Sequence, residues 1–447
     1  MNSSLLSRKI AFFVICFLLV FASHKPSISG IDSKARYHQI ASWFGDLEEG
    51  VELDQRYSIA QPVLAVPLYT LGKITEGNRD PQGAKKHRIA LVSQFNHLVL
   101  FVFLIWLYRW LLHGAQLKVS QVEEVILALL LFSFFLPHST DFYTEILWST
   151  SLFYSIVKGQ DYLAGRSISW VLLIAATFIA GWASPVALII LSLAVAPPLL
   201  WQWKKEGVAR GHIPLILSYG LGCMLAVVFF AGENYLEQGE FFRSGYSGEQ
   251  FGAFNFSLLG YLGLLISPGR GMLFFAPGFF LFFYFISKEL RPHFGEIERE
   301  AIISLWLAGA ATWLAFASWN YWGGAGYWGP RFLMLPSILG AYFLARLWHL
   351  RAYLSPQAKA MLMFLLGISF YVIRFGATYA QHFHHLCAPR RSVEGMVNCH
   401  FTWYESPFYL FTQDAAGWID FFLHRANVTL VICGVMFLGF RRYYSRE

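Results

Sequence analysis

Residues 89–111 read IALVSQFNHLVLFVFLIWLYRWL, and Arg109 is the one Lys, Arg, Asp or Glu in this stretch. A helix needs about 20 apolar residues to cross the hydrocarbon layer of a membrane, so this stretch is long enough to span it. In the whole chain of 447 residues, 56 % are hydrophobic and 14 % are charged. Ordinary soluble proteins have about 25 % charged residues. The sequence therefore predicts an integral membrane protein and excludes a soluble enzyme, a disordered scaffold and a disulfide-rich miniprotein.

Apolar runs of similar character recur along the chain, and each predicts a membrane-spanning helix. Arg8 and Lys9 precede the first run, and Arg441 and Arg442 follow the last. The positive-inside rule therefore places both ends in the cytoplasm, which requires an even number of spans. We expect one all-α membrane domain over residues 1–447, with about twelve transmembrane helices: 10–23, 89–111, 122–137, 144–158, 169–183, 184–200, 213–231, 271–287, 301–318, 331–349, 360–377 and 426–440.

The connections between these runs differ in length and charge. Every second short connection carries Lys or Arg, whereas those of the opposite set carry none. The net charge of +7 is thus spread as expected for topology, and the sequence indicates no nucleic-acid partner. The connections predicted to be external are 24–88, 232–270, 319–330 and 378–425. Residues 24–88 carry nine Lys or Arg, but long loops obey the charge rule poorly.

Two segments leave alternatives open. The Pro-rich stretch 61–72 is short for a span, and we interpret it as a re-entrant or interfacial helix, with a thirteenth span as the alternative. The first run has features of a signal peptide, including small residues at Ala22 and Ser23. An uncleaved helix is favoured, because no clean cleavage motif follows.

Asp32 is the first candidate catalytic residue. It lies in Asp32-Ser-Lys-Ala-Arg-Tyr-His38, directly outside the first run. A carboxylate at the membrane edge could act as a general base, since partial burial would raise its pKa. The alternative is a solvated carboxylate paired with Lys34 or Arg36.

Asp141 and Glu145 form a second acidic candidate in His138-Ser-Thr-Asp-Phe-Tyr-Thr-Glu145. Their i, i+4 spacing puts them on one helical face at the start of a predicted span. An ionisable group on a span is costly and suggests a function. The alternative is structural, because the helix dipole also favours acidic residues in a first turn.

Two Gly-rich turns each bring an arginine to the external membrane edge. One is Ser267-Pro-Gly-Arg270-Gly271, and the other is residues 319–331, WNYWGGAGYWGPR, which ends in Arg331. Glycine lets backbone approach a ligand, aromatic rings can stack against sugar or isoprenoid, and Arg suits bidentate phosphate binding. An interfacial anchor is the alternative for Arg331. The candidate substrate-lining residues are Tyr37, His138, Asp141, Trp319, Trp322 and Tyr327.

The last external connection contains His382, His384, His385, Cys387, Cys399 and His400. A Cys387–Cys399 disulfide is favoured over a zinc site, because no Cys-x-x-Cys pair is present and an external compartment would be oxidising. Cys16, Cys223 and Cys433 fall within predicted spans.

Taken in order, these segments resemble the multispanning glycosyltransferases of the GT-C fold, especially the branch of protein O-mannosyltransferases and aminoarabinose lipid A transferases. Asp32 with Arg36-Tyr37-His-Gln-Ile-Ala41 resembles the catalytic segment, and Tyr143-Thr-Glu145 the start of a later span. The turns 267–271 and 322–331 are the most specific matches, and 61–69 resembles the Pro-rich interfacial segment. Ser33 and Thr144 depart from the pattern, so a divalent metal ion stays open and no metal ligand is assigned.

The resemblance implies an inverting transfer of a sugar from a polyprenyl-phosphate donor to a glycolipid, such as lipid A or its core, or to a protein. Asp32 would be the general base with Glu145 as its acidic partner, and Arg270 and Arg331 would bind the donor phosphate. The site would face the periplasm from a bacterial inner membrane. The alternatives are a secondary transporter or lipid flippase with twelve spans and a non-catalytic lipid-binding subunit. Transporters tend to show repeated halves, which this sequence lacks.

Overall fold

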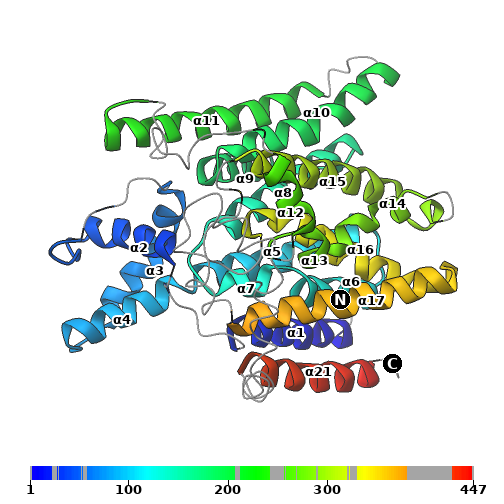
Figure 1. Cartoon of the computed structure of the whole chain (residues 1–447), viewed down its shortest axis with the longest axis horizontal. Coiled ribbons are helices and arrows are strands. Elements are labelled where there is room, and N and C mark those ends of the chain that lie inside the picture. The colour runs from blue at the N-terminus through cyan, green and yellow to red at the C-terminus, as the bar shows by residue number, and fades with distance from the viewer. Residues whose placement is uncertain are drawn as a thin grey trace.

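The computed structural model describes residues 3–22, 28, 30–51, 53, 58–206, 212–241, 256, 258–267, 269–287, 290–319, 322, 330–379 and 425–444. The regular elements in these residues are helices (Figure 1), which confirms the predicted all-α class. Five helical segments are long and apolar enough to cross a membrane: Pro81–His113, Ile213–Glu237, Glu296–Ala317, Arg331–His349 and Pro356–Gly376. Three shorter apolar helices accompany them, at Trp170–Ala183, Val186–Trp201 and Asn427–Gly439.

The first half of the chain forms an outer helix (residues 3–22), a projecting hairpin of three helices (31–92) and a group of packed helices (95–238). Their bounds are α1 (Ser3–Phe17) continued by the π-helical turn η1 (Leu18–Ala22), α2 (Ile31–Trp43), α3 (Ala60–Thr75), α4 (Pro81–Val92), α5 (Phe95–His113), α6 (Val119–Phe132), α7 (Phe135–Ser139), α8 (Glu145–Leu163), α9 (Trp170–Ala183), α10 (Val186–Glu206) and α11 (Ile213–Gln238). The second half comprises α12 (Leu258–Ile266), α13 (Met272–Phe275), η3 (Pro277–Leu281), α14 (Phe282–Phe285), η4 (Arg291–His293), α15 (Glu296–Ala317), η5 (Arg331–Leu333), α16 (Met334–His349), η6 (Arg351–Tyr353), α17 (Pro356–Tyr379) and α21 (Arg425–Tyr444).

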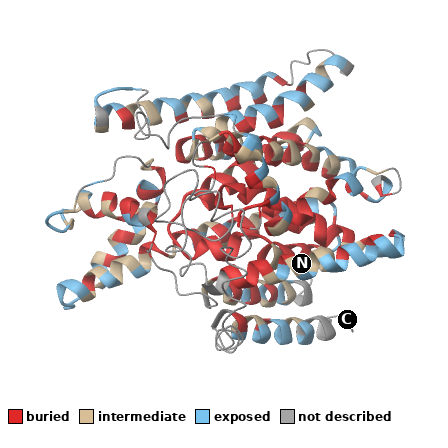
Figure 2. Ribbon diagram, in the orientation of Figure 1, coloured by how far each residue is buried: buried red, intermediate tan, exposed pale blue. Residues whose placement is uncertain are grey.

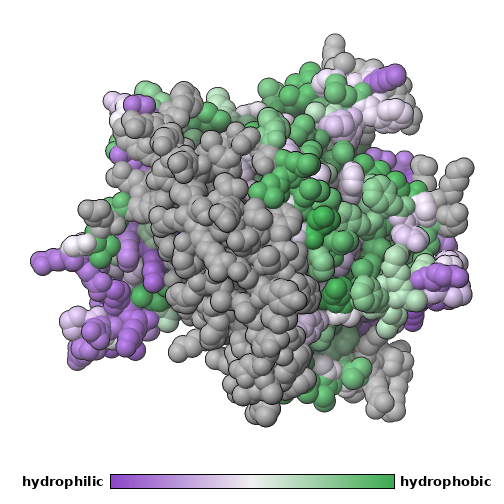
Figure 3. All heavy atoms as spheres, viewed as in Figure 1, coloured by the Kyte–Doolittle hydropathy of each residue, from purple (hydrophilic) through white to green (hydrophobic). Residues whose placement is uncertain are grey.

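The long helices run side by side around α16, which is buried along almost its whole length (Figure 2). The outer helices expose large apolar side chains, for example Val228 of α11, Phe364 of α17 and Val431 of α21. Apolar surface of this extent on outer helices suits contact with lipid. In Figure 3, hydrophilic residues gather at the end where α2, α3 and α4 project, and hydrophobic residues cover much of the described surface of the other half, with smaller hydrophilic patches at its edge.

The polar contacts join helix ends that the charge alternation places on the same side. On the predicted cytoplasmic side, these are the ion pairs Arg8–Glu123 (2.7 Å), Arg346–Glu298 (2.8 Å) and Lys158–Asp161 (2.8 Å). On the predicted external side, Glu233 accepts hydrogen bonds from the backbone N–H of Ile59 (2.7 Å) and from Trp182 Nε1 (3.2 Å). Each of these contacts thus joins segments that the sequence predicts on one side, and their orientation in the membrane stays a prediction.

Two of the predicted spans are not continuous helices. In the run 271–287, Ala276 leaves the helical conformation (φ −145°, ψ 50°) and Pro277 follows, so the run divides into α13, η3 and α14. Here Gly278 packs against α16 so closely that a Cβ atom would lie 2.3 Å from the carbonyl oxygen of Gly340. The run 122–137 is interrupted at Ser133, which is extended (φ −117°, ψ 170°) between α6 and α7.

The segment 61–72 forms one helix, α3, despite Pro67. One face packs against α2 and α4 through Ala65, Tyr69 and Gly72. Val63, Leu71 and Ile74 are exposed on the helix. An apolar exposed face on a short helix suits a position in the membrane interface. The predicted helix is confirmed, and its place at the interface remains a prediction.

Candidate active site

Asp32, Glu145 and Arg331 come together from three distant segments of the chain. Asp32 lies in the first turn of α2, Glu145 is the first residue of α8, and Arg331 is the first residue of η5. Arg331 Nη2 lies 2.6 Å from Asp32 Oδ2, and Arg331 Nε lies 3.4 Å from Glu145 Oε1. The structure thus brings these three predicted site residues together, and the phosphate partner predicted for Arg331 stays a prediction.

The environment of this cluster is largely apolar and closed. The exposed fractions of the Arg331, Asp32 and Glu145 side chains are 8 %, 14 % and 5 %. The guanidinium group of Arg331 also stacks 4.9 Å from the ring centroids of Tyr143 and Phe332. Two carboxylates and one guanidinium give these three side chains a formal charge of −1, and electrostatic interactions are strong in such a weakly solvated place.

Asp141 holds the start of the helix that carries Asp32. Its Oδ2 accepts a hydrogen bond from the backbone N–H of Gly30 (3.0 Å), the N-cap residue of α2, which has no side chain of its own to cap the helix. A Cβ atom on Gly30 would lie 2.0 Å from the hydroxyl oxygen of Tyr143, so glycine is required for this close approach. Asp141 is fully buried. Its observed role is to position α2, and the predicted contact with substrate stays a prediction.

Arg36 is a second cation beside the cluster, and the sequence predicted no catalytic or binding role for it. It lies one helical turn after Asp32 on α2, and its Nη2 donates to Thr144 Oγ1 at 3.4 Å. The side chain is buried. The i, i+4 spacing of Asp32 and Arg36 was the available signal for a shared face.

The connection before α8 is held by two buried amides, for which the sequence predicted no role. Asn96 Nδ2 of α5 donates to the carbonyl oxygens of Asp141 (2.6 Å) and Tyr143 (2.9 Å). Gln61 Nε2 of α3 donates to the Tyr143 carbonyl (3.0 Å) and to Asn96 Oδ1 (3.0 Å). The only sequence signal for these buried amides was their position as polar residues inside apolar helices. These bonds fix the turn from which Glu145 projects.

We predict that Asn96→Leu will lower the stability of the folded protein by about 2–3 kcal/mol, because it removes the three buried hydrogen bonds of Asn96 and each such bond contributes about 0.5–1.5 kcal/mol. It should also reduce activity, since the turn before Glu145 loses its support. Thermal unfolding of the purified protein in detergent tests the first effect, and turnover tests the second.

Gln160→Leu is the matched control, because Gln160 is a buried amide towards the other end of α8 that donates to Ser304 Oγ (2.8 Å). It should cost stability and preserve turnover. If Asn96→Leu unfolds at the same temperature as the wild type, the amides of Asn96 and Gln61 do not stabilise the turn before Glu145.

The remaining predicted residues have varied surroundings. Tyr37 packs 5.9 Å from the ring of Tyr69 within the α2–α4 hairpin, where burial raises the pKa of its phenol. His138 is buried in α7 beside Phe134, and the Trp319 ring lies 5.2 Å from that of Phe332.

Trp322 and Arg270 lie near α12. The Trp322 ring covers Gly263, where a Cβ atom would come within 2.3 Å of it, so this tryptophan packs on a helix. Arg270 is buried in the turn between α12 and α13, and its backbone N–H donates to Ser267 Oγ (3.0 Å). The roles predicted for these residues in substrate or phosphate binding stay predictions.

Several predictions fall outside the described residues. These concern Tyr327, the Cys387–Cys399 disulfide, the alternative zinc site with its four histidines, and the connection 378–425 apart from its first two residues and its last. Among the residues that the structure describes, no group of three or more His, Cys, Asp or Glu side chains could hold a metal ion.

Comparison with known proteins adds no relative to this picture. No protein-family model and no curated protein matches the sequence.

Proposed function

We propose that this protein is a membrane glycosyltransferase of the GT-C type, with about twelve spans, that uses a polyprenyl-phosphate sugar at the external face. The observation that carries the proposal is the cluster of Asp32, Arg331 and Glu145. A base beside a phosphate-binding cation is what a displacement at the anomeric carbon of a phosphate-linked sugar requires. The helix α2, which carries Asp32, lies at the end of the molecule away from both chain termini (Figure 1), which supports an external site.

The ion pair gives Arg331 and Asp32 coupled roles. Without substrate, the guanidinium group neutralises Asp32 at 2.6 Å. The donor phosphate would draw Arg331 into a bidentate interaction. Asp32 would then be left with less stabilisation of its charged form and would take the proton of the acceptor hydroxyl more readily. Donor binding therefore prepares the base.

The other charged groups complete the proposed reaction. The acceptor oxygen attacks the anomeric carbon as its proton passes to Asp32, and the polyprenyl phosphate leaves with the electron pair of the broken bond. Arg331, helped by Arg270, would stabilise the charge that develops on the phosphate. Glu145 would hold Arg331 in place while the phosphate engages its free edge. The acceptor is a glycolipid, such as lipid A or its core, or a protein hydroxyl, in the periplasm of a bacterium.

The proposal requires that α2 and α10 reach opposite sides of the membrane. Lys34→Cys, at an exposed position of α2, should react with a membrane-impermeant maleimide added to intact cells with permeabilised outer membranes. Lys204→Cys, at an exposed position near the end of α10, should react only after the inner membrane is opened. Ser33 is unsuitable for labelling because it is fully buried. Labelling of Lys34→Cys only from the cytoplasm would reject the external site.

The activity test is sugar transfer by purified protein from a radiolabelled polyprenyl-phosphate sugar, with extracted envelope lipids or a serine-containing peptide as acceptor. Uptake of a solute into vesicles without release of polyprenyl phosphate would instead favour the transporter alternative. A lipid-binding subunit would be favoured if the wild-type protein and the Asp32→Asn variant bind the donor equally well and neither of them transfers sugar.

A further inference from the structure

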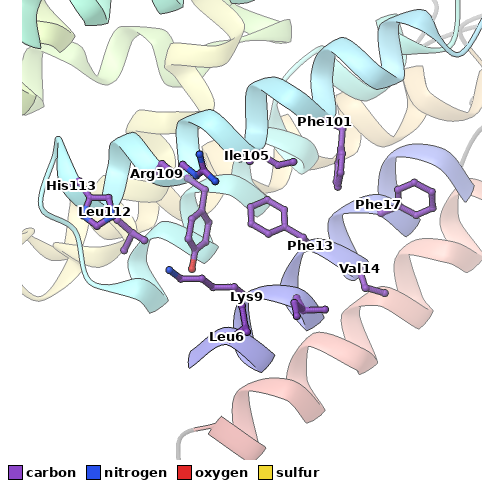
Figure 4. Close-up of a pocket in the computed structure, with 12 residues that line it drawn as sticks. Leu6, Lys9, Phe13, Val14, Phe17, Phe101, Ile105, Arg109, Leu112 and His113 are labelled. Carbon is purple, nitrogen blue, oxygen red and sulfur yellow. The ribbon is translucent and has the colours of Figure 1, made fainter. Parts of the chain in front are cut away.

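A groove lies between α1 and α5 (Figure 4), and none of the residues that line it belongs to the cluster of Asp32, Glu145 and Arg331. It encloses a cavity of about 660 Å³. One wall is the face of α1 that carries Leu6, Ile10, Phe13 and Phe17, and the other is the face of α5 that carries Phe101, Ile105 and Leu112. Phe13 and Phe101 contact each other across it, with ring centroids 6.2 Å apart. The groove is thus an apolar channel along two antiparallel helices.

Cations gather at one end of this groove. Lys9 of α1 and Arg109 and His113 of α5 lie at the end nearer the chain terminus, and Phe17 and Phe101 lie at the other (Figure 4). Within the described part of the chain, Lys9 and Arg109 form no ion pair, in contrast to Arg8, which pairs with Glu123 at 2.7 Å. Two positive charges therefore face the mouth of an apolar channel.

A buried hydroxyl group lies in the same wall. Tyr108 lines the groove and is 2 % exposed, and its hydroxyl oxygen has no hydrogen-bond partner among the described residues. A buried hydroxyl group without a partner is unfavourable by about 1–3 kcal/mol. A phosphate oxygen near Lys9 and Arg109 could accept its hydrogen bond.

The length of the groove fits one leaflet of a membrane. From His113 to Phe101 the helix α5 rises by about 18 Å, at about 1.5 Å per residue. Half of the hydrocarbon layer is about 15 Å thick. One acyl chain that begins at the cationic end would therefore lie along the groove for its whole depth.

From these observations we infer that the groove between α1 and α5 binds an anionic glycerophospholipid of the leaflet that faces the chain termini. Its phosphate contacts Lys9, Arg109 and the Tyr108 hydroxyl group, and one acyl chain lies between Phe13 and Ile105. This site is separate from the proposed transfer of sugar and does not depend on it.

Native mass spectrometry of the full chain in detergent tests the site, with phosphatidylglycerol and phosphatidylcholine of identical acyl chains as probes. Each cation near a membrane surface strengthens the binding of an anionic lipid about fivefold, so two predict a preference for phosphatidylglycerol of about twenty-five-fold. Lys9→Gln with Arg109→Gln should abolish this preference. Equal binding of the two lipids by the wild-type protein would overturn the inference.

Lys204→Gln with Lys359→Gln is the matched control, because both lysines are exposed at the same end of the molecule but lie outside the groove. This double variant should keep the preference for phosphatidylglycerol. If it loses that preference, the effect of the cations is a general effect of charge. Val14→Trp should fill the groove and weaken phosphatidylglycerol binding at least tenfold while the cations remain. The Val14→Trp variant leaves the charges intact, so it tests the inference even if the Lys9→Gln and Arg109→Gln double variant fails to fold.

Two competing occupants would be visible in the same spectra. Undecaprenyl phosphate that displaces phosphatidylglycerol when present at one tenth of its concentration would assign the groove to a polyprenyl phosphate. A lipid-free dimer that Val14→Trp dissociates would assign it to a second copy of the chain. Either result would overturn the inference, whereas competition by other anionic glycerophospholipids alone would support it.

Discussion

Arg331→Ala is expected to lower the rate of sugar transfer by on the order of a hundredfold, because removal of one preorganised charged donor from a transition state typically has an effect of this size. The variant should also be less stable. Asp32 and Glu145 would stay buried as like charges without their shared cation, and breaking a buried ion pair costs about 3–5 kcal/mol. Initial rates with a polyprenyl-phosphate sugar and thermal unfolding measure the two effects.

The stability cost can be separated from the catalytic cost. Arg331→Ala combined with Glu145→Gln removes one negative charge together with the positive one, so stability should partly recover while activity stays low. Arg331→Lys keeps the charge but loses the two-pronged geometry, and it should retain partial activity. Transfer by Arg331→Ala at the wild-type rate would reject the phosphate role and leave Arg331 as a structural ion-pair partner.

Asp32→Asn is expected to have the largest effect, a loss of turnover on the order of a thousandfold. General base catalysis typically contributes about a hundredfold to ten-thousandfold, and an amide cannot take up the proton. The fold should survive, because Glu145 remains to balance Arg331. Donor binding should also survive or become tighter, since Arg331 is released from its closest carboxylate. Single-turnover kinetics and donor titration distinguish binding from chemistry.

Asp46→Asn provides a matched control on the same hairpin. Asp46 accepts hydrogen bonds from Tyr69 (2.7 Å) and Lys73 (2.9 Å) and lies beyond the end of α2. It should therefore affect stability modestly and leave the chemistry unchanged. If Asp32→Asn and Asp46→Asn reduce turnover equally, Asp32 contributes through the fold and is not the base.

The sequence could predict the features that depend on local pattern. Long apolar runs predicted an all-helical membrane protein, and the positions of Asp32, Glu145 and Arg331 next to predicted helix ends placed them on one face. Pro277 is a local signal for the interruption after Ala276, but the apolar composition of 271–287 led to the prediction of one continuous span. A hydropathy pattern reports how apolar a run is and gives no information on whether its backbone is continuous.

The features that escaped prediction depend on contacts between distant segments. Asp141 accepts a hydrogen bond from Gly30, and Asn96 holds the backbone at Asp141 and Tyr143. Each acceptor is more than 40 residues from its donor. Likewise, the sequence does not show that the Trp322 ring packs on Gly263, a residue 59 positions earlier in the chain. No single sequence records which surface a ring or an amide meets.

The short segment from Asp141 to Glu145 also limits how the gene can change. Asp141 caps α2, Thr144 contacts Arg36, and Glu145 faces Arg331, so both ends of the segment are fixed to different parts of the molecule. One codon inserted here would turn the following helical residues by about 100° and move the carboxylate off its face. Single substitutions in this segment can therefore be tested at each position. An insertion or deletion would instead displace Glu145 from Arg331, because the segment is too short to compensate for it. Natural variation in loop length must be accommodated elsewhere in the chain.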